Sequence, residues 1–126
     1  MTQRPELTLS GIVLDAPDAR ELAAFYQRLL GWEVQQDEPD WVKIVPPGGG
    51  PGLSFQSEPV YERPTWPSTT DHQQMMIHLD LAVDDLEAAV AHALAAGATL
   101  ADFQPQEDVR VHYDPAGHPF CLFRRG

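Results

Sequence analysis

Residues 9–31 read LSGIVLDAPDARELAAFYQRLLG, and residues 76–97 read MIHLDLAVDDLEAAVAHALAAG. Both stretches have the pattern of a strand, then an amphipathic helix, then a glycine that ends the helix. The expected strands are Leu9–Val13 and Met76–Val83, and the expected helices are Asp18–Leu30 and Asp84–Ala96, ended by Gly31 and Gly97. The second stretch follows the first by 66 or 67 positions throughout. This internal repeat predicts two related modules in one chain.

The repeat continues beyond the helices. Trp32–Gln36 corresponds to Ala98–Phe103, and Pro51–Phe55 corresponds to Pro119–Phe123. Two copies of this length do not make a solenoid, whose units are shorter and more numerous. We therefore predict an α+β fold of paired βαβββ modules, with one cup-shaped mixed sheet around a single pocket and two outer helices.

The domain boundaries follow from the same repeat. A chain of 126 residues can bury one core but not two independent ones, so we expect a single domain over residues 1–126. The first module is expected over about residues 5–57 and the second over about residues 75–126. Residues 58–74 contain Pro59, Pro64 and Pro67 and are expected to form the linker.

Acidic residues mark the start of each predicted helix. Asp18 stands three positions before Glu21, and Asp84 stands three before Glu87, which is the spacing of a helix cap. Each helix also has one apolar stripe that predicts packing on a sheet. The stripes are Leu22, Phe25, Tyr26, Leu29 and Leu30 in the first helix, and Leu86, Ala89, Val90, Ala93 and Leu94 in the second.

The composition argues against several classes of partner. Eight basic and 19 acidic residues give a net charge of -11, which disfavours nucleic acid and anionic lipid. The single cysteine, Cys121, has no intrachain partner for a disulfide. No run approaches the roughly 20 apolar residues of a membrane span, and Arg4–Glu6 interrupt any apolar stretch of a secretory signal. We therefore expect a cytoplasmic protein without nucleic-acid or membrane partners.

Five short motifs carry a resemblance to a known family. They are GIVLDAPD at 11–18, Phe25-Tyr26, LLGW at 29–32, HLDLAVDD at 78–85 and YDPAGHP at 113–119. In these the chain resembles the vicinal oxygen chelate superfamily, which contains glyoxalase I, the bleomycin-resistance proteins and the extradiol dioxygenases, and it is similar to the small glyoxalase-like branch. The resemblance implies a homodimer, but it leaves the activity open because the fold serves many functions.

The resemblance also implies where a metal would be bound. Enzymes of this family typically bind a divalent ion through one residue on the first strand and one on the last strand of each module, usually histidine or glutamate. Carried over by position, these sites are Gly11, Leu53, His78 and Cys121. Ile12 and Ser54, one position further, are alternatives that do not restore the ligand set. We therefore expect no metal and no other cofactor.

Strand alternation places His78 and Asp80 on the same side of the second module's first strand, opposite its leucines. A hydrogen-bonded pair that only orders the sheet is one interpretation. Acid-base catalysis by the two residues is the other. A residual metal site that includes Cys121 is a third, although thiolate suits zinc better than hard metals. Cys121 itself is expected to pack as a small apolar residue rather than to act as a nucleophile.

Aromatic and apolar residues are candidates for a ligand wall. The proposed set is Val13, Trp41, Leu53, Phe55, Trp66, Phe103, Cys121 and Phe123, with core packing as the alternative for the aromatic members. A cup without metal ligands has room for a flat or bulky organic molecule, and the acidic surface favours a cationic one.

The expected function is therefore the binding of a small organic molecule without metal, as in drug-sequestering proteins. A metal-independent isomerase, lyase or cyclase that uses His78 and Asp80 is the alternative. We expect no catalytic role for His112, Tyr113 or His118, because Asp114, Pro115 and Gly117 explain that segment as a turn.

Overall fold

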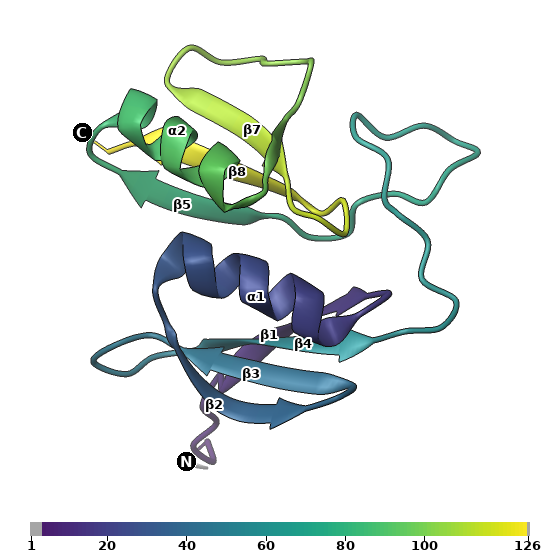
Figure 1. Ribbon diagram of the computed structural model, residues 1–126, viewed down its shortest axis with the longest axis vertical. Coiled ribbons are helices and arrows are strands. Elements are labelled where there is room, and N and C mark those ends of the chain that lie inside the picture. The colour runs from purple at the N-terminus through teal and green to yellow at the C-terminus, as the bar shows by residue number, and fades with distance from the viewer. Residues whose placement is uncertain (1–3, 126) are drawn as a thin grey trace.

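The computed structural model describes residues 4–125 and contains two βαβββ modules (Figure 1). The elements of the first module are β1 (Gly11–Ala16), α1 (Ala19–Leu30), β2 (Glu33–Glu38), β3 (Trp41–Val45) and β4 (Gly52–Ser57). Those of the second are β5 (Leu79–Val83), α2 (Leu86–Ala96), β6 (Thr99–Leu100), β7 (Val109–Tyr113) and β8 (Pro119–Arg124). The α+β fold of paired modules is confirmed.

Each module forms a four-stranded mixed sheet of the same topology. The first sheet has the order β1-β4-β3-β2 and the second has the order β5-β8-β7-β6. In both sheets the first and last strands of the module pair in parallel, and the remaining pairs are antiparallel. The strands are thus divided between two separate sheets, which differs from the expected single cup-shaped sheet.

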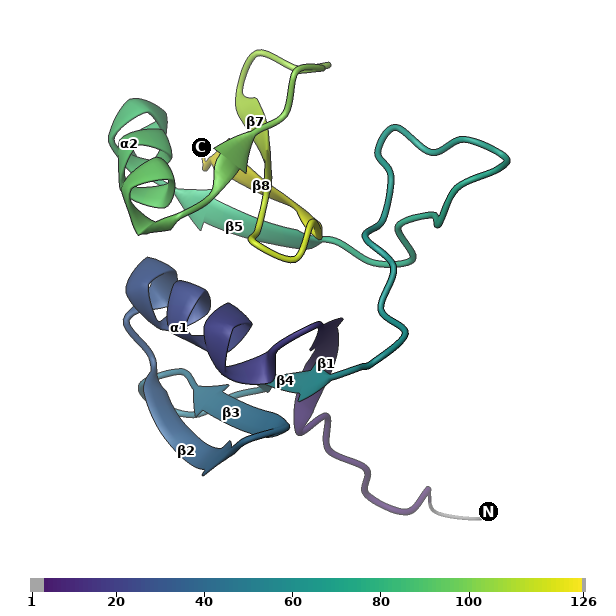
Figure 2. The ribbon, with the colours of Figure 1, turned by 45° about the vertical axis from the view of Figure 1, so that its right-hand side comes forward.

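Helix α1 lies between the two sheets rather than outside them (Figures 1 and 2). The Tyr26 ring stacks on Phe55 of β4, with centroids 5.4 Å apart. The Phe25 ring lies 6.0 Å from Phe120 of β8. Because Phe25 and Tyr26 are fully buried, burial of their rings joins both modules in one core.

The contact between the helices strengthens this arrangement. Arg28 Nε donates to the Ala96 carbonyl at 2.9 Å, and His92 Nε2 lies 3.0 Å from the Leu29 carbonyl oxygen. The buried stripe of α1 agrees with the prediction for Leu22, Phe25 and Tyr26. In α2, by contrast, the buried residues are Ala93 and Ala96, and Leu94 is 43% exposed.

The cap of the first helix is as predicted, and the cap of the second lies one residue later. Asp18 Oδ1 accepts from the backbone N–H groups of Arg20 and Glu21. In the second helix Asp85 caps, because its Oδ1 accepts from Ala88 N at 3.1 Å. Asp84 instead pairs with Arg125 at 2.9 Å. The predicted cap at Asp84 is therefore corrected to Asp85.

Several predicted strands are shifted at their ends. β1 begins at Gly11 rather than Leu9, and β5 begins at Leu79 rather than Met76. The expected strand over residues 98–103 is reduced to Thr99–Leu100, because residues beyond it leave the sheet and form the loop before β7. No helix within residues 4–125 has the length and apolar character needed to span a membrane.

Candidate functional site

The side of each sheet that faces away from α1 is called its outer face. Leu79 and Leu81 of β5 pack on the core, so Asp80, and His78 just before the strand, point to the outer face. Asp80 pairs directly with Cys121 of β8, and residues directly opposite in adjacent strands share a face. Phe123, two positions further along β8, lies on the same side. The second sheet thus gathers His78, Asp80, Cys121 and Phe123 on its outer face.

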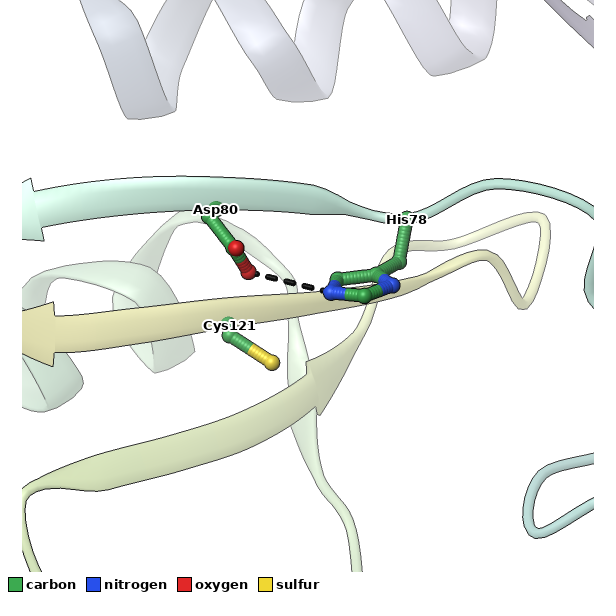
Figure 3. Close-up of side chains that lie close together, drawn as sticks. All are labelled: His78, Asp80 and Cys121. Atoms are coloured by element: carbon green, nitrogen blue, oxygen red, sulfur yellow. Dashed lines mark ion pairs between the residues drawn. The ribbon is translucent and has the colours of Figure 1, made fainter.

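Three of these side chains form a compact cluster (Figure 3). His78 Nε2 lies 3.1 Å from Asp80 Oδ1, and the two side chains are 40% and 60% exposed. One donor atom from each of His78, Asp80 and Cys121 lies within 4.8 Å of the others. Burial, and secondarily the nearby Asp80 carboxylate, raises the pKa of the Cys121 thiol above its ordinary value. The thiol is therefore protonated at neutral pH.

The cluster offers one nitrogen, one oxygen and one sulfur donor to a metal ion. A tetrahedral zinc ion has ligand distances of about 2.0–2.3 Å, which fits three donors within 4.8 Å of one another after small adjustments. Zinc at His78, Asp80 and Cys121 would supply a Lewis acid. A thiolate does not suit the harder ions such as manganese, which prefer oxygen. The donor set therefore fits zinc and fits a hard metal poorly.

Strand register decides which residues of the first module correspond to this cluster. Val13 pairs with Ser54 in the first sheet, as Asp80 pairs with Cys121 in the second. The counterpart of Cys121 is therefore Ser54, and the initial assignment to Leu53 is corrected by one residue. The counterpart of His78 is Gly11, two positions before Val13. Neither Gly11 nor Ser54 is a usual metal ligand, so the first module adds no donor to the set.

Two residues of the predicted ligand wall lie in the core instead. Leu53 is 5% exposed and Phe55 is fully buried. Both point toward α1, where Phe55 stacks on Tyr26. Strand alternation explains the difference, because a shift of one residue moves a side chain to the opposite face. Leu53 and Phe55 are thus corrected from ligand contacts to core residues.

The other predicted aromatic residues lie in two places. Trp66, in the linker, has its ring 5.7 Å from Phe103, and its carbonyl accepts from Tyr113 Oη at 2.8 Å. Tyr113 pairs with Pro119 of β8 and so shares the outer face of the second sheet. Val13 and Trp41 lie instead on the outer face of the first sheet. Because α1 separates the sheets, the two outer faces point away from each other.

A buried polar network outside the predicted set centres on Asp114. The side chain of Asp114 is fully buried, and its oxygens accept from Tyr26 Oη at 2.8 Å and from the backbone of Ala116 and His118 at 2.9 Å. His118 Nδ1 lies 2.8 Å from Asp114 Oδ2. The other ring nitrogen of His118 lies 3.3 Å from Tyr61 Oη. This network joins α1, the linker and the turn before β8.

The sequence predicts a turn over this segment but not its contacts with Tyr26 and Tyr61. Acceptance from Ala116, two residues on, is the local bond that an aspartate makes in a turn, and the motif at 114–118 predicts it. The bond from Tyr26 spans 88 positions. No local pattern predicts a contact of that separation. The one sequence feature that marks the position is an aspartate followed by proline between two apolar strands.

Comparison with known proteins agrees with this architecture. Residues 11–123 match the family described as glyoxalase-like domain. A glyoxalase/bleomycin resistance protein/dioxygenase family enzyme from Burkholderia phytofirmans has a TM-score of 0.68 at 22% identity, over 94% of this chain and 98% of that one. A fosfomycin resistance protein from Listeria monocytogenes, complexed with Mn(II) and sulfate, has a TM-score of 0.67 at 16% identity, over 94% and 90%.

An antibiotic binding protein from a Streptomyces species is also similar in fold, with a TM-score of 0.58 at 18% identity over 99% of this chain and 100% of that one. These identities are low, and the likeness to the solved structures concerns the fold alone. No curated protein sequence matches the chain. With two βαβββ modules and a family match over residues 11–123, the chain belongs to the glyoxalase-like domain family, within the vicinal oxygen chelate superfamily.

Proposed function

We propose that this protein binds a small organic molecule on the outer face of its second sheet, without a resident metal, and that a homodimer encloses the ligand. The observation that carries the proposal is the juxtaposition of His78, Asp80 and Cys121 beside Phe123. Polar groups beside an apolar wall are typical of small-molecule sites. The similar folds of an antibiotic binding protein and a fosfomycin resistance protein support the same class of ligand.

The state of the cluster supports binding without metal. His78 Nε2 and Asp80 Oδ1 are already 3.1 Å apart, so each satisfies the other. Burial raises the pKa of the Cys121 thiol, so a metal ion would have to displace its proton to bind there. Gly11 and Ser54 give no additional ligand from the first module. The three donors therefore serve a ligand as hydrogen-bonding groups.

Enclosure of the ligand is the argument for a homodimer. Within one chain the two outer faces point apart, so neither faces a second wall. If the first sheet of one protomer covers the second sheet of its partner, Val13 and Trp41 complete the site across from Phe123. The strands β1 and β5 lie at sheet edges, and covering exposed edges also stabilises the fold.

Titration with the neutral aromatic dye Nile red tests the proposal. We expect its emission to rise on binding, and Phe123→Ala to weaken binding by about 5- to 20-fold through loss of apolar contact. Val34→Ala is the matched control, because Val34 is 41% exposed on β2, away from this face. Equal binding by the Phe123 variant and the wild type would contradict the assigned face.

A second candidate function is metal-independent catalysis by His78 and Asp80. The 3.1 Å contact between them favours it, because the carboxylate orients the imidazole for proton transfer. Incubation of a bound compound followed by mass spectrometry separates the two functions. If the protein is an enzyme, His78→Gln should lower turnover by roughly 100- to 10,000-fold while much of the binding remains. A pure binder leaves the compound unchanged.

A further inference from the structure

A cavity separate from the His78 cluster lies where the two modules and the linker meet. Its volume is about 340 Å³, and it is bounded by 13–15 of β1, linker residues of the 58–64 segment, 73–77 before β5, and His118. His78, Asp80 and Cys121 are not among its lining residues. We call it the junction cavity. It is large enough for an organic molecule of one ring with a short substituent.

The side chains that line the junction cavity include three carboxylates, and one cation outside the lining, Arg63, acts electrostatically on the lining residue Tyr61. Asp15, Glu58 and Glu62 line it, and no lysine or arginine does. Among the described residues none of these three carboxylates takes part in an ion pair. Their protein partners are neutral donors at 3.2–3.4 Å. Bonds of that length to neutral groups leave each carboxylate able to bind a cation.

The remaining walls are apolar and aromatic. Val13, Val60 and the 75–77 segment, which contains two methionines, contribute aliphatic surface, and Tyr61 contributes its ring. Methionine side chains adapt to irregular ligands. The face of a tyrosine ring attracts an organic cation. The chemistry of the walls thus matches a molecule that has both a cationic group and an apolar body.

The polar end of the cavity is held rigid by the buried Asp114. The Asp114 carboxylate fixes His118 Nδ1 at 2.8 Å, and the Tyr61 hydroxyl donates to the Ala116 carbonyl at 2.8 Å. Burial, and secondarily Asp114, raises the pKa of Tyr61 to about 12, so this hydroxyl keeps its proton at neutral pH. Both side chains that line the cavity here are therefore held in place before any ligand arrives.

We propose that the junction cavity binds a small organic cation with an apolar body, such as a benzylic or alkylated ammonium compound. Asp15, Glu58 and Glu62 bind the cationic group, and Tyr61 with the methionine segment contacts the apolar body. This site is distinct from the outer face of the second sheet. Of the residues named for the site proposed above, Val13 alone also lines this cavity, so the carboxylate variants below test the cavity and not that site.

The methionine methyl groups provide the assay. The chain has three methionines, Met1, Met75 and Met76, and the last two line the cavity. In protein labelled with ¹³C-methyl methionine, benzyltrimethylammonium should shift the Met75 and Met76 signals in a saturable manner. Benzyl alcohol should bind at least fivefold more weakly, and benzoate should cause no saturable shift. Equal affinity for the cation and the alcohol would overturn the proposal.

Charge-neutral variants test the carboxylates. Each lost charge should weaken binding of benzyltrimethylammonium by about 1.5- to 5-fold, so the triple variant Asp15→Asn, Glu58→Gln and Glu62→Gln should bind about 3- to 125-fold more weakly. The matched control carries Glu33→Gln, Glu38→Gln and Glu107→Gln, which changes the net charge equally. It should alter affinity less than twofold.

The controls also separate this site from the other. Equal losses in the two triple variants would show that only the general field of the protein acts, and would refute the site. His78→Gln should leave the binding of benzyltrimethylammonium unchanged, because His78 does not line the cavity. A loss in that variant would place the probe at the outer face and refute the proposal.

Discussion

Removal of one hydroxyl from the buried network should destabilise the whole fold by a measurable amount. Tyr26 Oη donates to Asp114 Oδ2 at 2.8 Å, and both residues are buried. A hydrogen bond to a charged group contributes about 1.5–3 kcal/mol. Tyr26→Phe keeps the ring that stacks on Phe55, so apolar burial is nearly unchanged. We therefore expect the free energy of unfolding to fall by about 1.5–3 kcal/mol.

Urea unfolding followed by circular dichroism measures this change. With a slope of about 1–3 kcal/mol per molar urea, the midpoint should fall by about 1 M. The control is Tyr113→Phe, which loses a neutral bond from a partly exposed hydroxyl to the Trp66 carbonyl and should cost about 0.5–1.5 kcal/mol. If Tyr26→Phe is no more destabilising than Tyr113→Phe, the buried network does not join the modules as described.

Three further predictions concern single positions. Burial lowers the pKa of His112 in the folded chain. Below about pH 6.5, the ordinary pKa of histidine, the unfolded chain therefore binds more protons than the folded chain. The free energy of unfolding should then fall by at most about 1.4 kcal/mol for each unit by which the pH is lowered. Urea unfolding at pH 7 and pH 5 should show a smaller fall in the free energy of unfolding for His112→Leu than for the wild type, and an equal fall would contradict this. A Cβ at Gly52 would lie 2.5 Å from the Ile44 carbonyl oxygen. Gly52→Ala should therefore destabilise the fold by about 1–3 kcal/mol in the same assay. An unchanged midpoint would show that the strand shifts to accommodate the added methyl group. Because burial raises its pKa, Cys121 should react with iodoacetamide more slowly at pH 7.5 than a free cysteine does, measured by mass spectrometry, and a faster reaction would indicate an activated thiol.

The repeat in the sequence was enough to predict the architecture of each module. The strand periods, the cap at Asp18 and the glycines that end both helices are local signals, and local hydrogen bonds determine them. The cap at Asp85 was missed because Asp84 and Asp85 are adjacent, and only the contact of Asp84 with Arg125 distinguishes them. Such a contact is not encoded in the spacing of neighbouring residues.

The arrangement of the two modules was beyond the reach of the same reasoning. Periodicity predicts that Phe25 and Tyr26 are buried, but it does not show that they contact both sheets. That contact places α1 in the middle and turns the outer faces apart. The grouping of His78 with Asp80 was predictable from alternation alone, whereas the placement of Leu53 depended on a register shift of one residue. The Asp114 network depends on contacts across the whole chain.

Native mass spectrometry of the purified protein tests the central claim most directly, because one spectrum reports both the assembly and any bound metal. The account predicts an assembly of two chains of 14.0 kDa each, with no additional mass from a metal ion, and the same metal-free assembly for Cys121→Ser. A single chain as the dominant species would remove the partner that encloses the ligand. One zinc ion per chain, lost in the Cys121 variant, would show that His78, Asp80 and Cys121 form a metal centre instead.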